Sequence, residues 1–171
     1  MGCDLQSATL ADALVEDTTF VDCNLALVTL AGTRLQDVTF QRCKLSGVDF
    51  TRLGTSLIGS PLRFEDCVMV DSNFVGGKLA GSTFLRCDLS GADFAEADLT
   101  GGDLAGSVLR DARFERTNLT NAHLEGATEY RISPTNNKVK GLKVSLPDAV
   151  GLLLPFAVEI VDLPIAEPGP R

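Results

Sequence analysis

A five-residue spacing of apolar side chains runs through most of this chain. From Leu5 to Phe50 every fifth residue is apolar, and from Phe64 to Leu124 the same spacing continues in a second phase. A strand buries every second residue and a helix every third or fourth, so neither element explains a period of five. Because the five-residue spacing repeats along most of the chain, it outweighs the helix or strand propensity of any short segment. It indicates a solenoid, in which similar coils stack on one another.

Small side chains stand two positions before these apolar centres. The stretch "CDLSGADFAEADLTG" from Cys87 to Gly101 shows the pattern, with Cys or Ala before Leu or Phe. A large apolar residue with a small neighbour predicts two inward-facing side chains per repeat in a narrow tube. The other three positions are polar, charged or Gly, and we expect them to face solvent.

Cysteine and phenylalanine spacings indicate how many sides the tube has. The cysteines are separated by 20, 20, 24 and 20 residues, and two series of phenylalanines repeat the steps of 20 and 24. Like residues therefore stack every four repeats, which predicts coils with four sides of five residues. Coils stack at the usual strand spacing of ~4.8 Å, so about six coils make a rod ~29 Å long. The predicted fold is an all-β solenoid. The cysteines are Cys3, Cys23, Cys43, Cys67 and Cys87.

An interruption and a change of pattern divide the chain. The repeats predict a β-helix over residues 1–128 with a bulge near 51–62, where the phase slips within "TRLGTSLIGSPL". The bulge is interpreted either as a tolerated surface insertion or as a partner-contacting loop or bend. Residues 129–171 are predicted to form a connector, a short α-helix over roughly Leu146–Leu154 and a brief strand in "FAVEIVDL".

The predicted C-terminal helix gives the rod a cap. An exposed β-edge recruits other chains, so a solenoid needs its open end covered. Capping alone and capping combined with homodimerisation are both open interpretations. The residues expected to cover the last coil, and in the second case to contact a second copy, are Val150, Leu153, Leu154 and Phe156.

The residues that usually carry chemistry form no recognisable site. The one histidine, His123, precedes an apolar centre and should face solvent, and no Gly-rich phosphate loop is present. The cysteines fall at inward small-residue positions without CxxC spacing, which predicts a column of free thiols rather than metal ligands. We expect no catalytic, cofactor-binding or metal-binding residues, and therefore no enzyme.

Acidic charge is concentrated in the repeats. Residues 1–128 hold 18 acidic and 10 basic residues, a net of −8, whereas 129–171 hold five of each. This balance argues against direct binding to nucleic acid or an anionic membrane. The N-terminus lacks a signal-peptide pattern, and a cytoplasmic protein is expected.

Two acidic groups are candidate surfaces for a protein partner. The first is expected to ring one coil and is the predicted interaction site, and the second lies near the N-terminus. The ring is Asp88, Asp93, Asp98 and Asp103, and the N-terminal acidic group is Asp12, Glu16, Asp17, Asp22 and Asp37.

The unit read from Cys87 to Gly101 resembles the repeat of the pentapeptide-repeat family, roughly Ala-Asp/Asn-Leu-x-x, and the resemblance covers about residues 3–127. It implies a right-handed quadrilateral β-helix. The chain is also similar in size and C-terminal ending to the subgroup that protects DNA gyrase and topoisomerase IV from quinolones (the Qnr type and the mycobacterial fluoroquinolone-resistance type). That resemblance implies a DNA-mimicking, gyrase-binding homodimer. A non-catalytic interaction scaffold with a different partner is the alternative.

Overall fold

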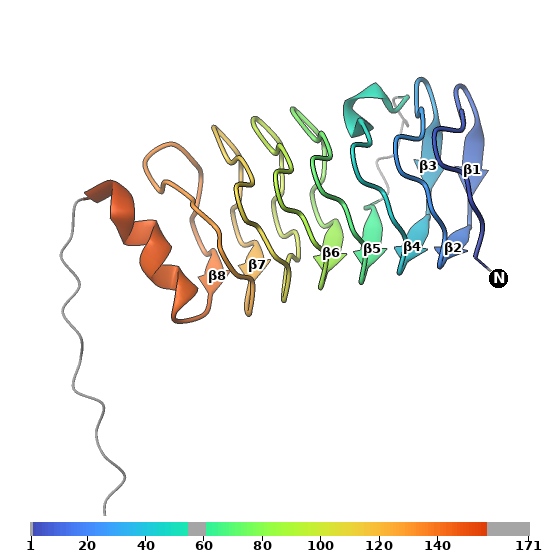
Figure 1. Ribbon diagram of the computed structural model, residues 1–171. Coiled ribbons are helices and arrows are strands. Elements are labelled where there is room, and N and C mark those ends of the chain that lie inside the picture. The colour runs from blue at the N-terminus through green and yellow to red at the C-terminus, as the bar shows by residue number, and fades with distance from the viewer. Residues whose placement is uncertain (1, 55–60, 157–171) are drawn as a thin grey trace, which may run out of the picture.

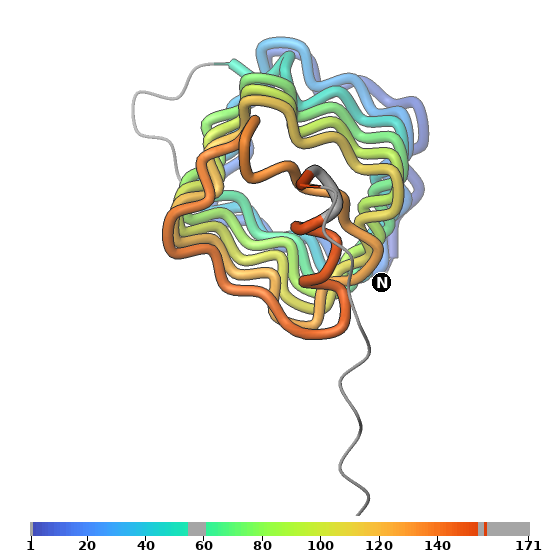
Figure 2. The backbone as a smooth tube through the Cα atoms, turned by 90° about the vertical axis from the view of Figure 1, so that its left-hand side faces the viewer, coloured from blue at the N-terminus to red at the C-terminus, as the bar shows by residue number. Residues whose placement is uncertain are grey.

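Short parallel strands stack into the walls of a four-sided β-helix (Figures 1 and 2). The computed structural model describes residues 2–54 and 61–156, which wind through about six turns with almost no helix. One wall is a sheet of order β2-β4-β5-β6, a second wall holds the pair β1-β3, and β7 pairs with β8 near the C-terminal end. The strands are β1 (Leu14–Glu16), β2 (Thr19–Val21), β3 (Arg34–Gln36), β4 (Thr39–Gln41), β5 (Arg63–Glu65), β6 (Thr83–Leu85), β7 (His123–Leu124) and β8 (Lys143–Val144).

The strand register confirms the predicted coil lengths. Phe20 pairs with Phe40, Phe40 with Phe64, and Phe64 with Phe84, so successive coils contain 20, 24 and 20 residues. Each coil satisfies its backbone groups mainly against its neighbours. The Leu5 amide, for example, donates to the Asn24 carbonyl at 2.7 Å.

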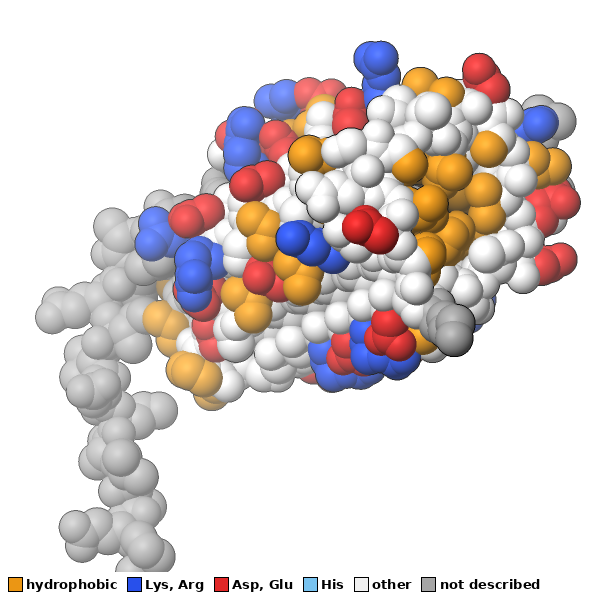
Figure 3. Space-filling view, turned by 45° about the vertical axis from the view of Figure 1, so that its right-hand side comes forward, with side chains coloured by type: hydrophobic (Ala, Val, Ile, Leu, Met, Phe, Trp, Pro, Cys, Tyr) orange, Lys and Arg blue, Asp and Glu red, His pale blue; other side chains and the backbone are white. Residues whose placement is uncertain are grey.

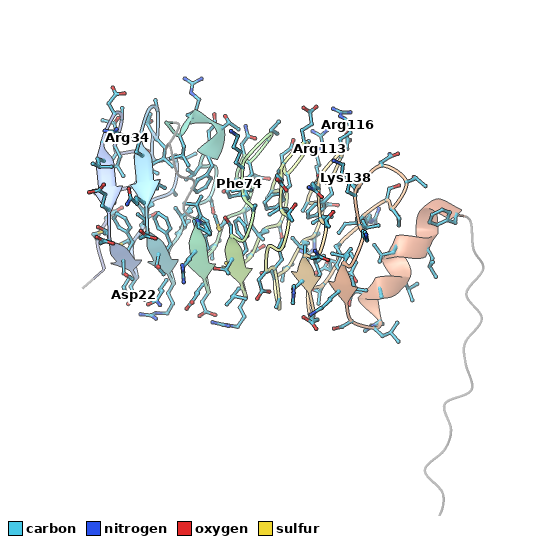
Figure 4. All side chains as sticks on the ribbon, turned by 180° about the vertical axis from the view of Figure 1, so that it is seen from behind. Asp22, Arg34, Phe74, Arg113, Arg116 and Lys138 are labelled. Carbon is cyan, nitrogen blue, oxygen red and sulfur yellow. The ribbon has the colours of Figure 1, made fainter. Side chains whose placement is uncertain are left out.

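The predicted inward pairs form the core. Apolar centres of the middle coils are fully buried, and the small residue two positions earlier is buried beside them. Two columns of phenylalanine rings run along the tube and meet edge to face. Phe74 stacks on Phe50 at 4.5 Å and on Phe94 at 4.9 Å between ring centroids, and it meets Phe64 and Phe84 nearly at right angles. Figure 4 shows Phe74 inside the rod.

A left-handed backbone residue makes each corner. The residue two positions after a centre has a positive φ, as at Asp17 (45°), Arg86 (53°) and Gly101 (62°). Gly, Asn and Asp tolerate this conformation best, which explains why they recur at this position of the repeat. The corner, rather than a long strand, therefore sets the length of each side.

The cysteines lie along one wall as free thiols, as predicted, and four of the five are buried. The Cys43 thiol donates to the Phe20 carbonyl at 3.4 Å, and Cys67 donates to Phe40 in the same way at 3.4 Å. A hydrogen bond with the Cys67 side chain, together with burial, raises the pKa of the Cys43 thiol. The Cys43 thiol therefore remains protonated, and the four buried cysteines act as small core side chains.

The interruption begins with the 3₁₀ helix η1 (Phe50–Arg52). Asp49 caps it by accepting from the Thr51 amide at 3.1 Å. Leu53, which neither repeat phase marks as a centre, packs against the core. The rest of the predicted bulge, residues 55–60, lies outside the described residues.

The β-helix continues beyond residue 128, where the sequence predicts its end. Thr128 bridges to Val108, Lys138 to Asn118, and β8 pairs with β7, so a further irregular coil reaches Val144. The C-terminal helix is η2 (Asp148–Phe156), a 3₁₀ helix that starts two residues after the predicted α-helix. In Figure 2 it crosses the open end of the tube. The strand predicted in "FAVEIVDL" falls almost entirely outside the described residues.

Candidate functional site

The ring of aspartates lies on the four sides of one coil, as predicted, but its carboxylates hold turns together. Each accepts a hydrogen bond from the amide two residues later. Asp98 accepts from the Thr100 amide at 3.0 Å, from the Thr100 hydroxyl at 2.6 Å and from the Asn118 side chain at 3.1 Å. These bonds lower the pKa of the Asp98 carboxyl, the Thr100 hydroxyl having the largest effect. The corresponding acceptors are Asp88 for Ser90, Asp93 for Ala95 and Asp103 for Ala105.

Basic residues flank the same ring. Arg113 pairs with Asp93 at 3.1 Å, and a neighbouring coil places Lys78 beside Asp98. All four aspartates are only partly exposed. The ring is therefore a structural part of the coil whose charge is partly offset.

The turn role of Asp98 can be separated from its charge. Asn already accepts the same turn bond at equivalent positions, as in Asn118 with the Thr120 amide at 3.3 Å. We expect Asp98→Ala to lower the free energy of unfolding by about 1 kcal/mol, and Asp98→Asn to lower it by about half as much or less. Urea denaturation at pH 7 checks both. Equal losses in the two variants would contradict the turn role.

The lowered pKa of Asp98 also fixes the sign of a pH effect. Its ionisation contributes stability that is fully present above the pKa of an unfolded aspartate, about 4, and is lost as pH falls through the lower folded pKa. Wild-type protein should therefore lose stability relative to Asp98→Asn as the pH falls from about 5 towards the lowered folded pKa of Asp98. Parallel urea titrations of the two proteins between about pH 2.5 and 7 measure the difference.

A ladder of alternating charges runs along one corner. Asp22 pairs with Arg42 at 2.7 Å, and one step further Asp66 pairs with Arg86 at 2.7 Å. Arginine hydrogen bonding lowers the pKa of both aspartates. Because all four side chains are exposed, these pairs contribute little to stability. They neutralise this corner, and Figure 3 shows the mixed acidic and basic side chains along the lower edge of the rod.

The N-terminal acidic group is more exposed than the ring. Only Asp22 of this group forms an ion pair within the described part of the chain. Asp17 and Asp37 lie at neighbouring corners of stacked coils, as predicted, because Glu16 pairs with Gln36 directly before them. Asp12, Glu16, Asp17 and Asp37 are all exposed. Residues 1–22, which include the first coil, therefore carry five exposed carboxylates and no basic residue.

The cap residues only partly follow the prediction. Val150 is half-buried, whereas Leu153 and Phe156 are 41% and 50% exposed, and Leu154's side chain lies outside the described residues. Leu152, which the sequence did not single out, packs against the core instead. Between η2 and the last coil is a hollow of about 360 Å³ lined by residues that include Arg110, Tyr130 and Asp148.

Tyr130 is buried, and its hydroxyl has no hydrogen-bond partner among residues 2–54 and 61–156. Burial, with a smaller effect of Asp148, raises the pKa of this hydroxyl. We expect Tyr130→Phe to raise the free energy of unfolding by about 1 kcal/mol, because it removes an unpaired buried polar group and keeps the ring. Thermal unfolding measures the change, and a lower melting temperature would contradict it.

Residues that could support catalysis or metal binding are dispersed. His123 is partly exposed, as predicted, and its Nδ1 lies 3.1 Å from the Glu125 carboxylate. In the described ranges, no group of three or more His, Cys, Asp or Glu side chains is arranged to hold a metal ion. None of the helices described is long and apolar enough to cross a membrane.

Family models match most of the chain. The model for pentapeptide repeats in eight copies matches residues 67–106 and 87–126, and the model for a pentapeptide repeat region matches residues 1–74. The chain belongs to the pentapeptide-repeat family. Among curated proteins, none matches the chain.

Two solved structures share the fold of this pentapeptide-repeat protein. A trypsin-treated variant of QnrB1, described as a plasmid-mediated fluoroquinolone resistance protein, is similar with a TM-score of 0.66 and 14% identity, covering 93% of this chain and 92% of that one. A second trypsin-treated QnrB1 variant has a TM-score of 0.62 and 15% identity, with coverage of 94% and 100%. A pentapeptide-repeat protein from the Arabidopsis thaliana thylakoid lumen is 37% identical over 64% of this chain and 71% of its own, with a TM-score of 0.37.

The ion pairs of this pentapeptide-repeat protein were missed at the sequence level. Asp22–Arg42, Asp66–Arg86, Asp93–Arg113 and Glu96–Arg116 are all separated by 20 residues. The coil length that aligns the cysteines therefore also predicts these pairs. Figure 4 shows Arg113 and Arg116 projecting from one edge of the rod and Asp22 from the opposite edge.

Proposed function

We propose that this protein is a non-catalytic acidic rod that binds DNA gyrase in place of duplex DNA and so modulates the enzyme or protects it from quinolones. The observation that carries the proposal is the acidic surface of the first two coils, where Asp12, Glu16, Asp17 and Asp37 are exposed and form no ion pair within the described residues. A basic groove built for DNA would attract such a surface.

The charge density of the rod fits a partial imitation of DNA. Duplex DNA carries one negative charge per ~1.7 Å, so ~29 Å of duplex carries about 17 charges. Residues 1–128 carry a net charge of −8. The rod thus has the sign of duplex DNA and roughly half its charge over a similar length. Because exposed charges drive the contact, binding should weaken steeply as salt rises.

A supercoiling assay tests the proposal. Purified full-length protein at micromolar concentration is added to gyrase and relaxed plasmid, with and without a quinolone. We expect inhibition of supercoiling or relief of quinolone-stabilised DNA cleavage. Unchanged supercoiling and unchanged cleavage at these concentrations would contradict gyrase binding.

Two charge-removing variants locate the contact. One replaces the exposed N-terminal carboxylates (Asp12→Asn, Glu16→Gln, Asp17→Asn, Asp37→Asn), and the matched variant replaces the ring (Asp88→Asn, Asp93→Asn, Asp98→Asn, Asp103→Asn). Asn tolerates the left-handed corners and retains the turn bonds. The N-terminal variant should weaken gyrase binding about tenfold or more, and the ring variant should weaken it less. A larger loss in the ring variant would move the contact to the ring.

A scaffold with a different protein partner is the second candidate. The charge ladder and the basic residues beside the ring favour it, because they break the negative surface that a DNA-like rod needs. A pull-down from bacterial lysate separates the candidates. Gyrase subunits should dominate the captured proteins under the first proposal and be absent under the second.

We also propose that the exposed Leu153 and Phe156 on η2 join two copies as a homodimer. Size-exclusion chromatography with light scattering should give twice the mass of one chain. The variant Phe156→Ser should shift that mass towards the monomer. A monomeric wild-type chain at micromolar concentration would exclude this contact.

A further inference from the structure

The N-terminal end of the rod exposes its apolar interior. Leu5, Leu10, Val15 and Phe20 are only partly buried, whereas Leu25 and Leu45 in the following coils of the same column as Leu5 are each 1% exposed. Figure 3 shows apolar side chains gathered towards this end with acidic side chains at the margin. The first coil thus presents a four-sided apolar surface that no coil among residues 2–54 and 61–156 covers.

The backbone of the first coil is also open on this side. Between stacked coils, two amides of each repeat donate to carbonyls of the next coil: the amide of the apolar centre and the amide of the residue two positions later. The Leu5 amide donates to the Asn24 carbonyl in this way, and the Ser7 amide donates to the Ala26 carbonyl. In the described chain, no amide donates to the first-coil carbonyls that a preceding coil would use, including those of Gln6 and Ala11. These carbonyls are therefore acceptors for an incoming coil.

The opposite end carries the complementary donors. Within the described residues, the amides of Val139 and Gly141 in the last coil donate no hydrogen bond, and they occupy the positions that would donate to a following coil. The cap segment satisfies two other edge amides with side-chain oxygens. Ser145 Oγ accepts from the Gly126 amide at 3.1 Å, and Asp148 Oδ1 accepts from the Glu129 amide at 3.0 Å. The cap thus substitutes for the carbonyls of a next coil.

The two ends carry opposite charge. Residues 1–22 contain five acidic and no basic residues, and residues 130–144 contain four basic and no acidic residues. The basic side chains Arg131, Lys138, Lys140 and Lys143 are exposed. Two N-terminal ends brought together would repel, whereas an N-terminal end and a last coil attract.

We propose that the first coil of one copy docks on the last coil of a second copy once η2 moves aside, so that the cap controls a head-to-tail assembly. A second copy is the matching partner because its coil turns a corner every five residues and can therefore pair with all four sides of the tube's open end. An extended peptide from another protein would pair with one side only. The cap is held through Leu152, which is only partly buried, with Leu153 and Phe156 exposed. This contact joins two different surfaces, the first coil of one copy and the last coil of the next. Each added copy therefore leaves a free end, and the assembly grows as a linear rod.

Two full-length cap variants test this assembly. Leu152→Asp weakens the packing of η2, and Ser145→Ala combined with Asp148→Ala frees the edge amides without altering the core. We expect both to form rods that lengthen with protein concentration at constant cross-section, measured by sedimentation velocity and small-angle X-ray scattering. Wild-type protein should show no such growth. Cap variants that keep the wild-type mass and length at 100 μM, or that form compact particles, would overturn the proposal.

A matched pair of charge reversals distinguishes docking from general stickiness. Asp17→Lys reverses charge in the first coil, and Asp71→Lys does so in mid-rod, and both sites are exposed corners with positive φ. In either cap variant, Asp17→Lys should raise the dissociation constant of the end-to-end contact about tenfold at low salt, and Asp71→Lys should change it less than about twofold. Equal effects of the two substitutions would exclude the acidic first coil as the docking surface.

Discussion

Replacing Phe74 with alanine is expected to lower the free energy of unfolding by about 3 to 5 kcal/mol. Phe74 is 1% exposed and lies between the stacked rings of Phe50 and Phe94, with two further rings at its edges. The neighbouring backbone is fixed by hydrogen bonds to coils on both sides, so the cavity cannot collapse easily. Loss of one coil also removes the support of its neighbours, because a solenoid is stabilised through nearest-neighbour contacts.

Phe20→Ala is the matched control. Phe20 lies in the first coil, is only partly buried and, among the rings that the structure describes, stacks on Phe40 alone, at 5.2 Å between ring centroids. Phe20→Ala should lower the free energy of unfolding by about half as much as Phe74→Ala or less, because part of the Phe20 ring is already in contact with water. Guanidinium titrations followed by circular dichroism measure both variants. Similar losses at the two positions would contradict the burial gradient from the end to the middle of the rod.

Ser107→Ala is expected to lower the free energy of unfolding by about 2 to 3 kcal/mol. Ser107 is completely buried, donates to the Phe84 carbonyl at 2.6 Å and accepts from the Cys87 amide at 2.8 Å. Alanine leaves both backbone groups buried without these partners. The loss is large for a single hydroxyl because water cannot replace it inside the tube.

The chain itself offers the control for Ser107. Cys43 and Cys67 occupy the inward small-residue position in other coils and donate to carbonyls of the preceding coil. Ser107→Cys should therefore lower the free energy of unfolding by about half as much as Ser107→Ala. The thiol has a shape similar to that of the hydroxyl and keeps both hydrogen bonds in weaker form. Urea denaturation compares the two. A cysteine variant less stable than the alanine variant would indicate that volume, rather than hydrogen bonding, limits this position.

The repeat predicted the fold well because each coil uses the same side-chain pair to close the tube. The spacing of Phe20, Phe40, Phe64 and Phe84 alone gives the strand register that the structure shows. The coil after Ala127 could not be predicted in this way. Tyr130 and Ile132 are buried there without the five-residue phase, and backbone bridges, rather than a side-chain pattern, hold that coil in register.

The candidate site was less predictable than the fold. Charge counting identified Asp88, Asp93, Asp98 and Asp103 as one ring but could not reveal that each carboxylate accepts a turn bond. Asn24, Asn73 and Asn118 occupy the same repeat position and make the same bond, and an amide there was the available sequence signal. The cap also escaped prediction in part, because a single apolar run does not indicate which of its side chains faces the coil.

Competition with labelled duplex DNA for gyrase tests the central functional claim most directly. Fluorescence anisotropy follows a gyrase–duplex complex as wild-type protein is added, with the Asp12, Glu16, Asp17 and Asp37 neutralised variant alongside. If the acidic coils occupy the DNA groove, wild-type protein releases the duplex, the variant requires about tenfold more protein, and added salt reduces the effect. Gyrase that binds this protein while retaining its duplex, or that does not bind it at all, would contradict the claim.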